Sequence, residues 1–174
     1  MKGIVSLTIF IVSCFSLHAQ SMLDVFTPAF CDSTAINVYE KPGEGHKVLP
    51  NKTDKEVFYL LSIVDKEGNF FKVEPQGRVG GDEWGFKAWI HIGEVYTIIQ
   101  NYSGRTIPLY CIPQKGSFST CSILESKICA VYDICNEFVL VNLLDEKHAW
   151  GWVHKCHLND SPYTTNTSID NVEP

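Results

Sequence analysis

One pattern of residues occurs twice in this chain, and the repeat restricts the possible folds more than any other feature of the sequence. Each copy has an opening apolar strand with a nearby proline, a β-branched or aromatic run, an alternating strand that begins with Phe, and a closing Ala/Gly-Trp-Ile/Val-His block. The blocks occupy 38–42, 61–65, 70–73 and 88–91 in the first copy, and 109–113, 130–133, 138–141 and 151–154 in the second. The spacing differs because the first copy has an extra loop at 75–82. We therefore expect duplication of one small β unit.

The hydrophobic period predicts β-strands almost throughout, and helix signals are almost absent. In each copy a β-branched run and an alternating strand flank turn residues, which predicts a hairpin at 57–74 and another at 128–144. Alternation would place Phe71 and Val73 on one face of the strand, with Lys72 and Glu74 on the other. Val139, Val141 and Leu143 occupy the matching positions of the second copy. The expected fold class is all-β.

The repeat and the turn chemistry at 101–104 together predict two domains joined by a short linker. The boundaries we expect are 1–19 for a signal peptide, 20–32 for a lead-in, 33–96 and 107–160 for the two units, 97–106 for the linker, and 161–174 for a polar, disordered tail.

The N-terminus is typical of a secretory signal peptide. Lys2 precedes an apolar run at 3–17, and Ala19 offers a small residue for cleavage. The run is too short to span a membrane, and no second segment of spanning length follows. We expect an exported protein in the periplasm or at the cell surface. An alternative is a lipoprotein anchored at Cys14, because 11–14 also fits a lipobox.

Six cysteines remain after the leader, and an even number in an exported protein predicts disulfides. Five of them lie in the second copy. Sequence cannot choose among the 15 possible connectivities. A bridge between Cys129 and Cys135 is disfavoured, because an extended strand rising about 3.3 Å per residue separates them. The candidate disulfide residues are Cys31, Cys111, Cys121, Cys129, Cys135 and Cys156.

The order of the blocks, closing with Gly151-Trp152-Val153-His154, resembles the bacterial SH3 (SH3b) domain, here in tandem. The resemblance covers about residues 33 to 160. The first copy departs from the family pattern by Ala88 in place of glycine and by its extra loop. The resemblance implies two small SH3-like barrels that act as binding or targeting modules, often found beside a cell-wall hydrolase.

Charge makes some partners poor candidates. The net charge is −6, and lysines alternate with acidic residues without a basic cluster. We therefore expect no nucleic acid and no anionic membrane surface as partner.

No residue pattern favours catalysis or a metal site. Cys135 does not open a helix as the nucleophile of a cysteine peptidase would, so partnership with His148 or His154 is disfavoured. His154, Cys156 and His157 form the densest group of potential ligands, but on a strand His157 would point away from the other two. We expect no enzyme activity, no cofactor and no metal.

Each closing strand places a tryptophan and a histidine on one face, at Trp89 with His91 and at Trp152 with His154. These tryptophans either cover the end of a barrel or line a groove, with the tyrosine of the opening strand, that binds sugar or peptide. Trp84 lies in the long loop of the first copy. The candidate binding residues are Tyr39, Trp84, Trp89, His91, Tyr110, Trp152 and His154.

Three functions remain compatible with the sequence. The first is a non-catalytic binding module for a cell-wall peptide or glycan or an envelope protein. The second is an inhibitor or immunity-type protein, since an acidic protein could block a basic wall-degrading enzyme by electrostatic steering. The third is a structural subunit of an envelope assembly. The oligomeric state is not evident from the sequence.

Overall fold

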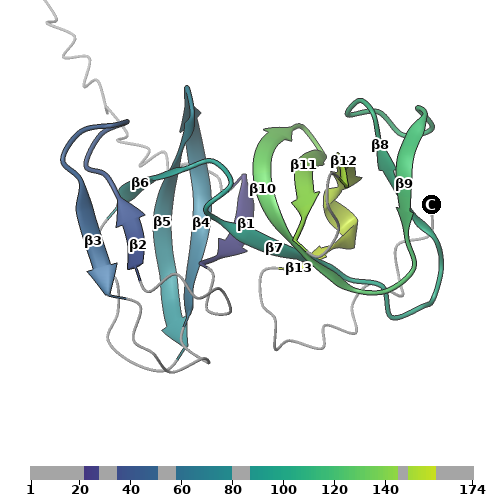
Figure 1. Cartoon of the computed structure of the whole chain (residues 1–174), viewed down its shortest axis with the longest axis horizontal. Helices are drawn as coiled ribbons and strands as arrows, with labels where there is room; N and C mark the ends of the chain where they lie inside the picture. The colour runs from purple at the N-terminus through teal and green to yellow at the C-terminus, as the bar shows by residue number, and fades with distance from the viewer. Residues whose placement is uncertain (1–21, 28–34, 51–57, 80–86, 145–148, 160–174) are drawn as a thin grey trace, which may run out of the picture.

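A computed structural model describes residues 22–27, 35–50, 58–79, 87–144 and 149–159, and within them the chain is all-β with antiparallel pairing. The described residues contain no α-helix, only a single 3-10 turn, which confirms the expected fold class. The elements, shown in Figure 1, are β1 (Leu23–Phe26), β2 (Ala35–Val38), β3 (Lys47–Pro50), β4 (Phe58–Glu67), β5 (Phe70–Val79), β6 (Ala88–His91), β7 (Tyr96–Ile99), β8 (Ile107–Tyr110), β9 (Ser119–Ile123), β10 (Lys127–Cys135), β11 (Phe138–Leu143), β12 (Trp150–His154), η1 (Lys155–His157) and β13 (Leu158–Asn159).

The two copies of the sequence repeat fold in the same way. In the first, β4 and β5 form a hairpin, β1 pairs with β4, and β6 pairs with β5. In the second, β10 and β11 form the hairpin, β7 pairs with β10, and β12 pairs with β11. Both hairpins turn at a residue of positive φ, Gly68 and Asn136, which are residue types that tolerate this conformation. The predicted hairpins are therefore confirmed.

The two hairpins also share an irregularity. The register of the first shifts between Ile63 and Asp65, and that of the second between Val131 and Asp133. Each shift inserts one residue into the first strand of its hairpin, as in a β-bulge, which bends the strand and increases its twist. The common position of the bulges indicates that the repeat extends to backbone detail.

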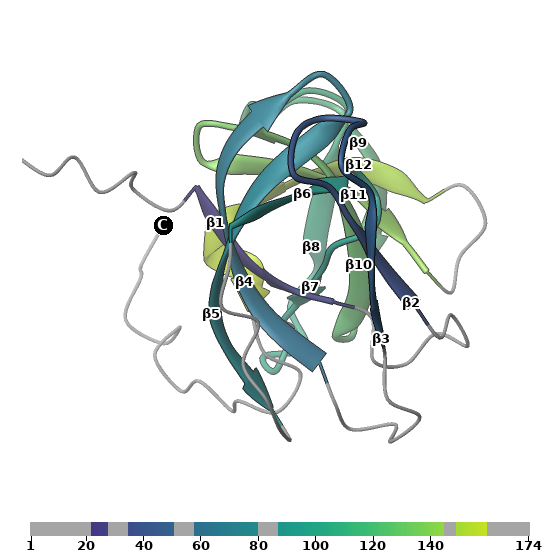
Figure 2. The ribbon, with the colours of Figure 1, turned by 90° about the vertical axis from the view of Figure 1, so that its left-hand side faces the viewer.

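The copies form two lobes, with β1–β6 in one and β8–β13 in the other (Figure 1). The main sheet follows the order β6-β5-β4-β1-β7-β10-β11-β12-β8-β9, with β13 on β7, and β2 and β3 form a separate pair. This pair lies to one side of β4 and β5 (Figure 2). The described pairings do not close into a ring, so the fold that they show is an all-β antiparallel sheet of two lobes.

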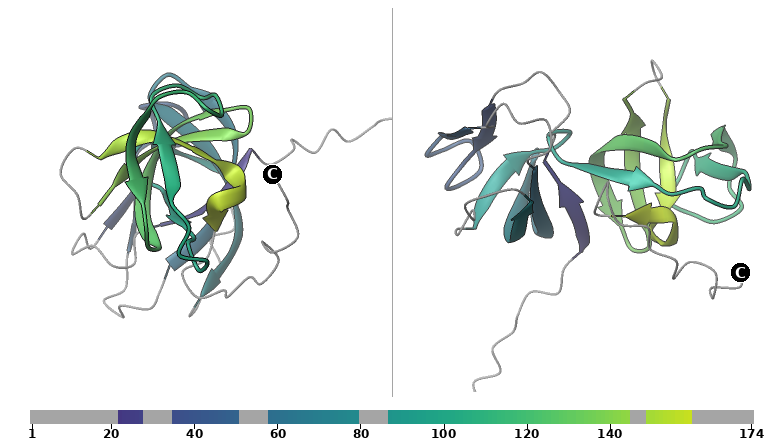
Figure 3. Two further views of the ribbon diagram at one scale, coloured as in Figure 1. Left: turned by 90° about the vertical axis from the view of Figure 1, so that its right-hand side faces the viewer. Right: turned by 90° about the horizontal axis from the view of Figure 1, so that it is seen from below.

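Two strands lie outside the two expected units. The segment 97–106, expected as a linker, contains most of β7, and the lead-in 20–32 contains β1. Both strands belong to the sheet because they carry apolar side chains that the core buries, among them Val25 and Ile99. β7 runs from the first lobe into the second (Figure 3, right). It pairs with β1 through Phe26 and Tyr96, and with β10 and β13.

The expected alternation is confirmed in the core. Phe71 and Val73 are fully buried on β5, and Val139 and Val141 are fully buried on β11. Buried side chains of both lobes form a single hydrophobic cluster. Burial of apolar area is the main stabilising contribution in folding, so the two lobes are stabilised together.

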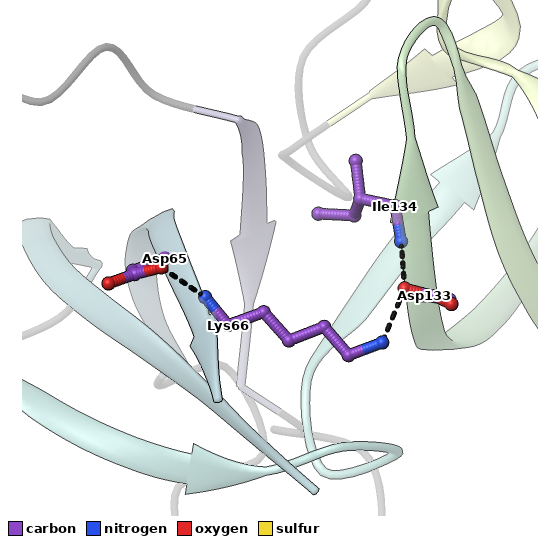
Figure 4. Close-up of polar contacts among 4 residues, drawn as sticks. All are labelled: Asp65, Lys66, Asp133 and Ile134. Atoms are coloured by element: carbon purple, nitrogen blue, oxygen red, sulfur yellow. Dashed lines mark hydrogen bonds and ion pairs between the residues drawn. The ribbon is translucent and has the colours of Figure 1, made fainter. Parts of the chain in front are cut away.

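Backbone and side-chain contacts join the lobes next to β7. The Gly93 N–H donates to the Val131 carbonyl at 2.8 Å, and the Val131 N–H donates to the Val95 carbonyl at 2.9 Å. Lys66, near the tip of the first hairpin, forms an ion pair with Asp133 on β10 (Figure 4).

The glycine of the second closing block has a packing role. A Cβ atom at Gly151 would lie 2.6 Å from the Leu109 Cβ on β8, closer than real Cβ atoms approach. The first copy has the buried Ala88 at this position. The second lobe therefore requires glycine at position 151, because β8 approaches it closely, whereas the first lobe accommodates alanine at position 88.

Candidate functional site

Aromatic side chains gather on the outer face of the first lobe. Tyr39 and Trp89 pair across two strands, with each N–H donating to the other's carbonyl at 2.8 Å. Phe70 and His91 form the next cross-strand pair. The Phe70 ring lies edge-on to Tyr39 at 5.1 Å and edge-on to His91 at 5.2 Å between ring centroids. We call these four residues the first aromatic face.

The second lobe repeats this arrangement. Trp152 pairs with Tyr110, and Phe138 pairs with His154. The Phe138 ring lies edge-on to Tyr110 at 6.1 Å and to His154 at 5.2 Å. We call these four residues the second aromatic face.

The pleat of the closing strands explains why these residues face outward. Ile90, between Trp89 and His91, is fully buried, and so is Val153 in the second lobe. Side chains alternate across a strand, so the tryptophan and histidine on either side point away from the core. The predicted pairing of each tryptophan with its histidine on one face is confirmed, and the tyrosine of each opening strand joins them.

The sequence reasoning missed Phe70 and Phe138. Their signal was present, because alternation places Phe71 on one face of the strand with Val73, which leaves Phe70 on the other face with Lys72. It was overlooked because a large apolar residue at the start of a strand is ordinarily taken for core. Each phenylalanine lies between the tyrosine and the histidine of its own face.

A hydrogen bond fixes the end of each closing strand. The Ile92 N–H, after His91, donates to the Asn69 carbonyl at 3.0 Å, and the Lys155 N–H, after His154, donates to the Glu137 carbonyl at 2.8 Å. Each acceptor immediately precedes the phenylalanine of its face. The hairpin turn therefore positions the histidine beside the phenylalanine.

The first aromatic face has polar groups at its border. His46 lies 5.3 Å from Tyr39 between ring centroids, and its Nε2 is 2.9 Å from the Asn37 Oδ1. Burial raises the pKa of Glu94, while the charges of His91 and His46 act in the opposite direction. Histidine and carboxylate groups thus adjoin the rings, and they could pair with polar parts of a ligand.

The second aromatic face is more enclosed. Phe138 is buried, whereas Phe70 is only partly buried. The turn η1 begins directly after His154, and the Cys156 N–H donates to the His154 Nδ1 at 3.2 Å. Burial and the nearby charges of His154 and Lys115 lower the pKa of His157. This histidine therefore favours its neutral form.

Trp150 does not belong to either face. It packs against Tyr132 with ring centroids 4.2 Å apart, near the junction of the lobes. Trp84, which the sequence indicated as a candidate, lies outside the described residues.

No disulfide joins Cys111, Cys129, Cys135 or Cys156 in the part of the chain that the structure describes. The disulfides expected of the second repeat stay a prediction. Cys129 faces the core and is fully buried, where its thiol donates to the Thr97 carbonyl. Cys31 lies outside the described residues, as do the predicted signal peptide and tail.

Two further findings concern the described part of the chain alone. There, no three His, Cys, Asp or Glu side chains lie together in a way that could hold a metal ion. No helix in that part has the length and apolar character needed to cross a membrane.

Comparison with known proteins identifies no family. No family model matches the sequence, and no curated protein matches it. Among solved structures, NlpC2 from Trichomonas vaginalis is 12% identical with a TM-score of 0.31, over 82% of this chain and 50% of that chain. NlpC1 from the same organism is 13% identical with a TM-score of 0.31, over 89% of this chain and 51% of that chain. The chain spans about half the length of these two proteins, and likeness at this level indicates neither a fold family nor a function.

Proposed function

We propose that this protein is a non-catalytic binding module with two equivalent sites, the first and second aromatic faces. The observation that carries the proposal is the repetition of Tyr, Phe, Trp and His in the same cross-strand arrangement on the outside of both lobes. A fold needs aromatic residues inside its core. Seven of the eight side chains of the two faces are at least partly exposed, Phe138 being the buried one, and such repeated placement beside a histidine is typical of a contact surface.

The chemistry of these faces suits recognition of sugar or peptide. Aromatic rings provide large contact area at a low cost in side-chain entropy, and imidazole supplies a hydrogen-bonding group. Two weak sites on one chain increase overall retention on a ligand that presents many copies, without new contacts at either site. A polymeric ligand such as the cell wall, or an envelope protein, would meet this condition.

The tandem SH3-like organisation and export belong to the same proposal. They are supported by the order of the sequence blocks, which resembles SH3b domains, and by the leader-like N-terminus. Under this proposal the protein acts in the periplasm or at the cell surface.

The test compares tryptophans on and off the faces. Trp89→Ala and Trp152→Ala should each weaken retention on purified sacculi or on immobilised envelope extract, and the double variant should lose more. Trp150→Ala is the control for loss of an indole on the same side of β12, because Trp150 packs on Tyr132 and is not one of the four residues of the second aromatic face. Circular dichroism checks that each variant folds.

Three outcomes would contradict the proposal. The first is equal retention of folded Trp89→Ala, Trp152→Ala and Trp150→Ala proteins. The second is release of soluble muropeptides by the purified protein, which would indicate an enzyme. The third is stoichiometric capture of a basic wall-degrading enzyme that the double variant leaves unchanged, which would favour the inhibitor function.

A further inference from the structure

The two aromatic faces differ at one position that lies beside the tryptophan. On β5, Lys72 is the cross-strand partner of Trp89. On β11, Leu140 is the cross-strand partner of Trp152. The lobes thus present the same rings with a cation in one case and an aliphatic side chain in the other.

Lys72 differs from the four lysines that form an ion pair in the described part of the chain. Lys47, Lys66, Lys87 and Lys127 each form an ion pair with a carboxylate. The Lys72 Nζ instead lies 5.8 Å from the centroid of the Trp89 ring. A cation–π contact at a partly exposed site is worth only about 0.5–1 kcal/mol, so it leaves the ammonium able to bind an anion.

The carboxylates beside Lys72 on the β4–β5 hairpin have other partners. Asp65 is opposite Lys72 in the β4–β5 ladder, and its Oδ1 accepts the Lys66 N–H at 2.8 Å. No ion pair joins Asp65 to Lys72 in the part of the chain that the structure describes. Glu74 lies on the same strand and forms an ion pair with Lys87.

We propose that the first aromatic face binds the free carboxylate end of a peptide through Lys72, and that the second aromatic face has no preference for a carboxylate. This inference rests on the proposed function and adds the ligand chemistry of one of its two sites. The ring geometry favours a peptide over a sugar. Phe70 is edge-on to both of its neighbours, so this surface is corrugated and suits side chains better than the flat face of a pyranose.

The experiment follows the indole N–H signals of Trp89 and Trp152 by NMR during titration with acetyl-alanyl-alanine and with its C-terminal amide. The Trp89 signal should report about threefold tighter binding of the free acid, which is the scale of an exposed ion pair. The Trp152 signal should report no preference.

Exchange of the two side chains provides the decisive variants. Lys72→Leu should abolish the preference at Trp89, and Leu140→Lys should create one at Trp152. Each substitution installs the residue that the other lobe already holds at the equivalent position, which limits the risk of unfolding. Lys87→Leu is the matched control for loss of a positive charge, and it should keep the preference at Trp89.

An unchanged preference at Trp89 in folded Lys72→Leu protein would overturn the inference. So would N-acetylmuramic acid binding at Trp89 in a Lys72-dependent way while the peptide does not bind. If neither peptide shifts either indole signal, the inference is also wrong. The proposed function fails separately, through its own outcomes such as equal retention of the tryptophan variants and the unaltered protein on sacculi.

Discussion

Gly93 lies in the turn between β6 and β7 and combines two constraints. Its φ is +84°, and a Cβ atom there would lie 2.8 Å from the Tyr132 Cζ, on the bulge of β10. Its N–H also donates across the lobe junction to Val131. Only glycine satisfies both the left-handed conformation and the close approach.

We predict that Gly93→Ala lowers the free energy of unfolding by about 2–3 kcal/mol, from backbone strain together with the displaced tyrosine. Chemical denaturation measures this. The matched control is Gly104→Ala, which has φ +64° but open space around its Cβ, and which should cost about 1–2 kcal/mol. Equal costs for the two variants would show that the contact with Tyr132 contributes nothing.

The thiols give a second prediction at the scale of the residue. Burial raises the pKa of both Cys129 and Cys156, but Cys129 is fully buried, whereas Cys156 and Cys111 are exposed. Since the thiolate is the reactive form, alkylation of reduced native protein at pH 8 should modify Cys111 first and Cys156 more slowly, and should leave Cys129 protected until unfolding. Mass mapping of alkylated peptides measures the order. Blockage of Cys111 or Cys156 before reduction would instead support the disulfides that the cysteine count predicts.

Single residues also show the limits of pattern reading. Periodicity placed Trp89 and His91 on one face correctly, because the alternation of side chains along a strand does not depend on the rest of the fold. It did not assign Phe70 to that face, because the same pattern suits a core residue at the end of a strand. The cross-strand neighbour of Phe70, His91, identifies the face on which Phe70 lies, and this neighbour is distant in sequence.

At the scale of elements, the contact between the two hairpins is the clearest feature. The Lys66 Nζ lies 2.5 Å from the Asp133 Oδ1, and the Ile134 N–H donates to the same oxygen at 2.8 Å (Figure 4). In the first lobe, Asp65 accepts the N–H of the following residue in the same way. Asp65 and Asp133 therefore each accept a hydrogen bond from the following residue, and Asp133 also forms the ion pair with Lys66.

We predict that Asp133→Ala costs more stability than Lys66→Met, because it removes the local hydrogen bond as well as the ion pair. Lys66 and Asp133 are 30% and 36% exposed, so solvent screens the pair, and their coupling should stay below about 1 kcal/mol. A double-mutant cycle measured by denaturation gives this coupling. Asp65→Ala is the control for the local bond alone. A coupling above about 2 kcal/mol would contradict the screening argument.

Elements with a strong alternating pattern were found from sequence, whereas several with weak signals, among them β1 and β7, were not. β1 and β7 are short, and turn residues at 101–104 drew the boundary across β7. Asn101, at that boundary, is buried and donates from its side chain to the Arg105 and Ile123 carbonyls. A polar residue with such partners resembles a linker in sequence, and only the partners identify it as part of the packed structure.

At the scale of the molecule, β7 belongs to both lobes. It follows the turn of the first lobe, pairs with β1, and provides the partner strand of β10 in the second. Buried residues from Leu23 to Val153 form a single cluster. The lobes therefore share both a strand and a core.

We predict a single cooperative unfolding transition. Calorimetric and van't Hoff enthalpies should agree, and tryptophan fluorescence and circular dichroism should give the same midpoint, because neither lobe keeps its core without β7. Two resolved transitions, or a midpoint that depends on the probe, would show that the lobes unfold independently.

The sequence by itself determined the all-β class, the duplication, both hairpins and the outward side of Trp89 and Trp152, because strand parity and turn chemistry are local properties. Tertiary structure decided that β7 joins the lobes and that Phe70 and Phe138 complete the aromatic faces. It also decided that Lys72 lies beside Trp89, whereas Leu140 lies at the equivalent position beside Trp152. These features depend on which strands become neighbours, and chain segments far apart in sequence establish that only when they pack.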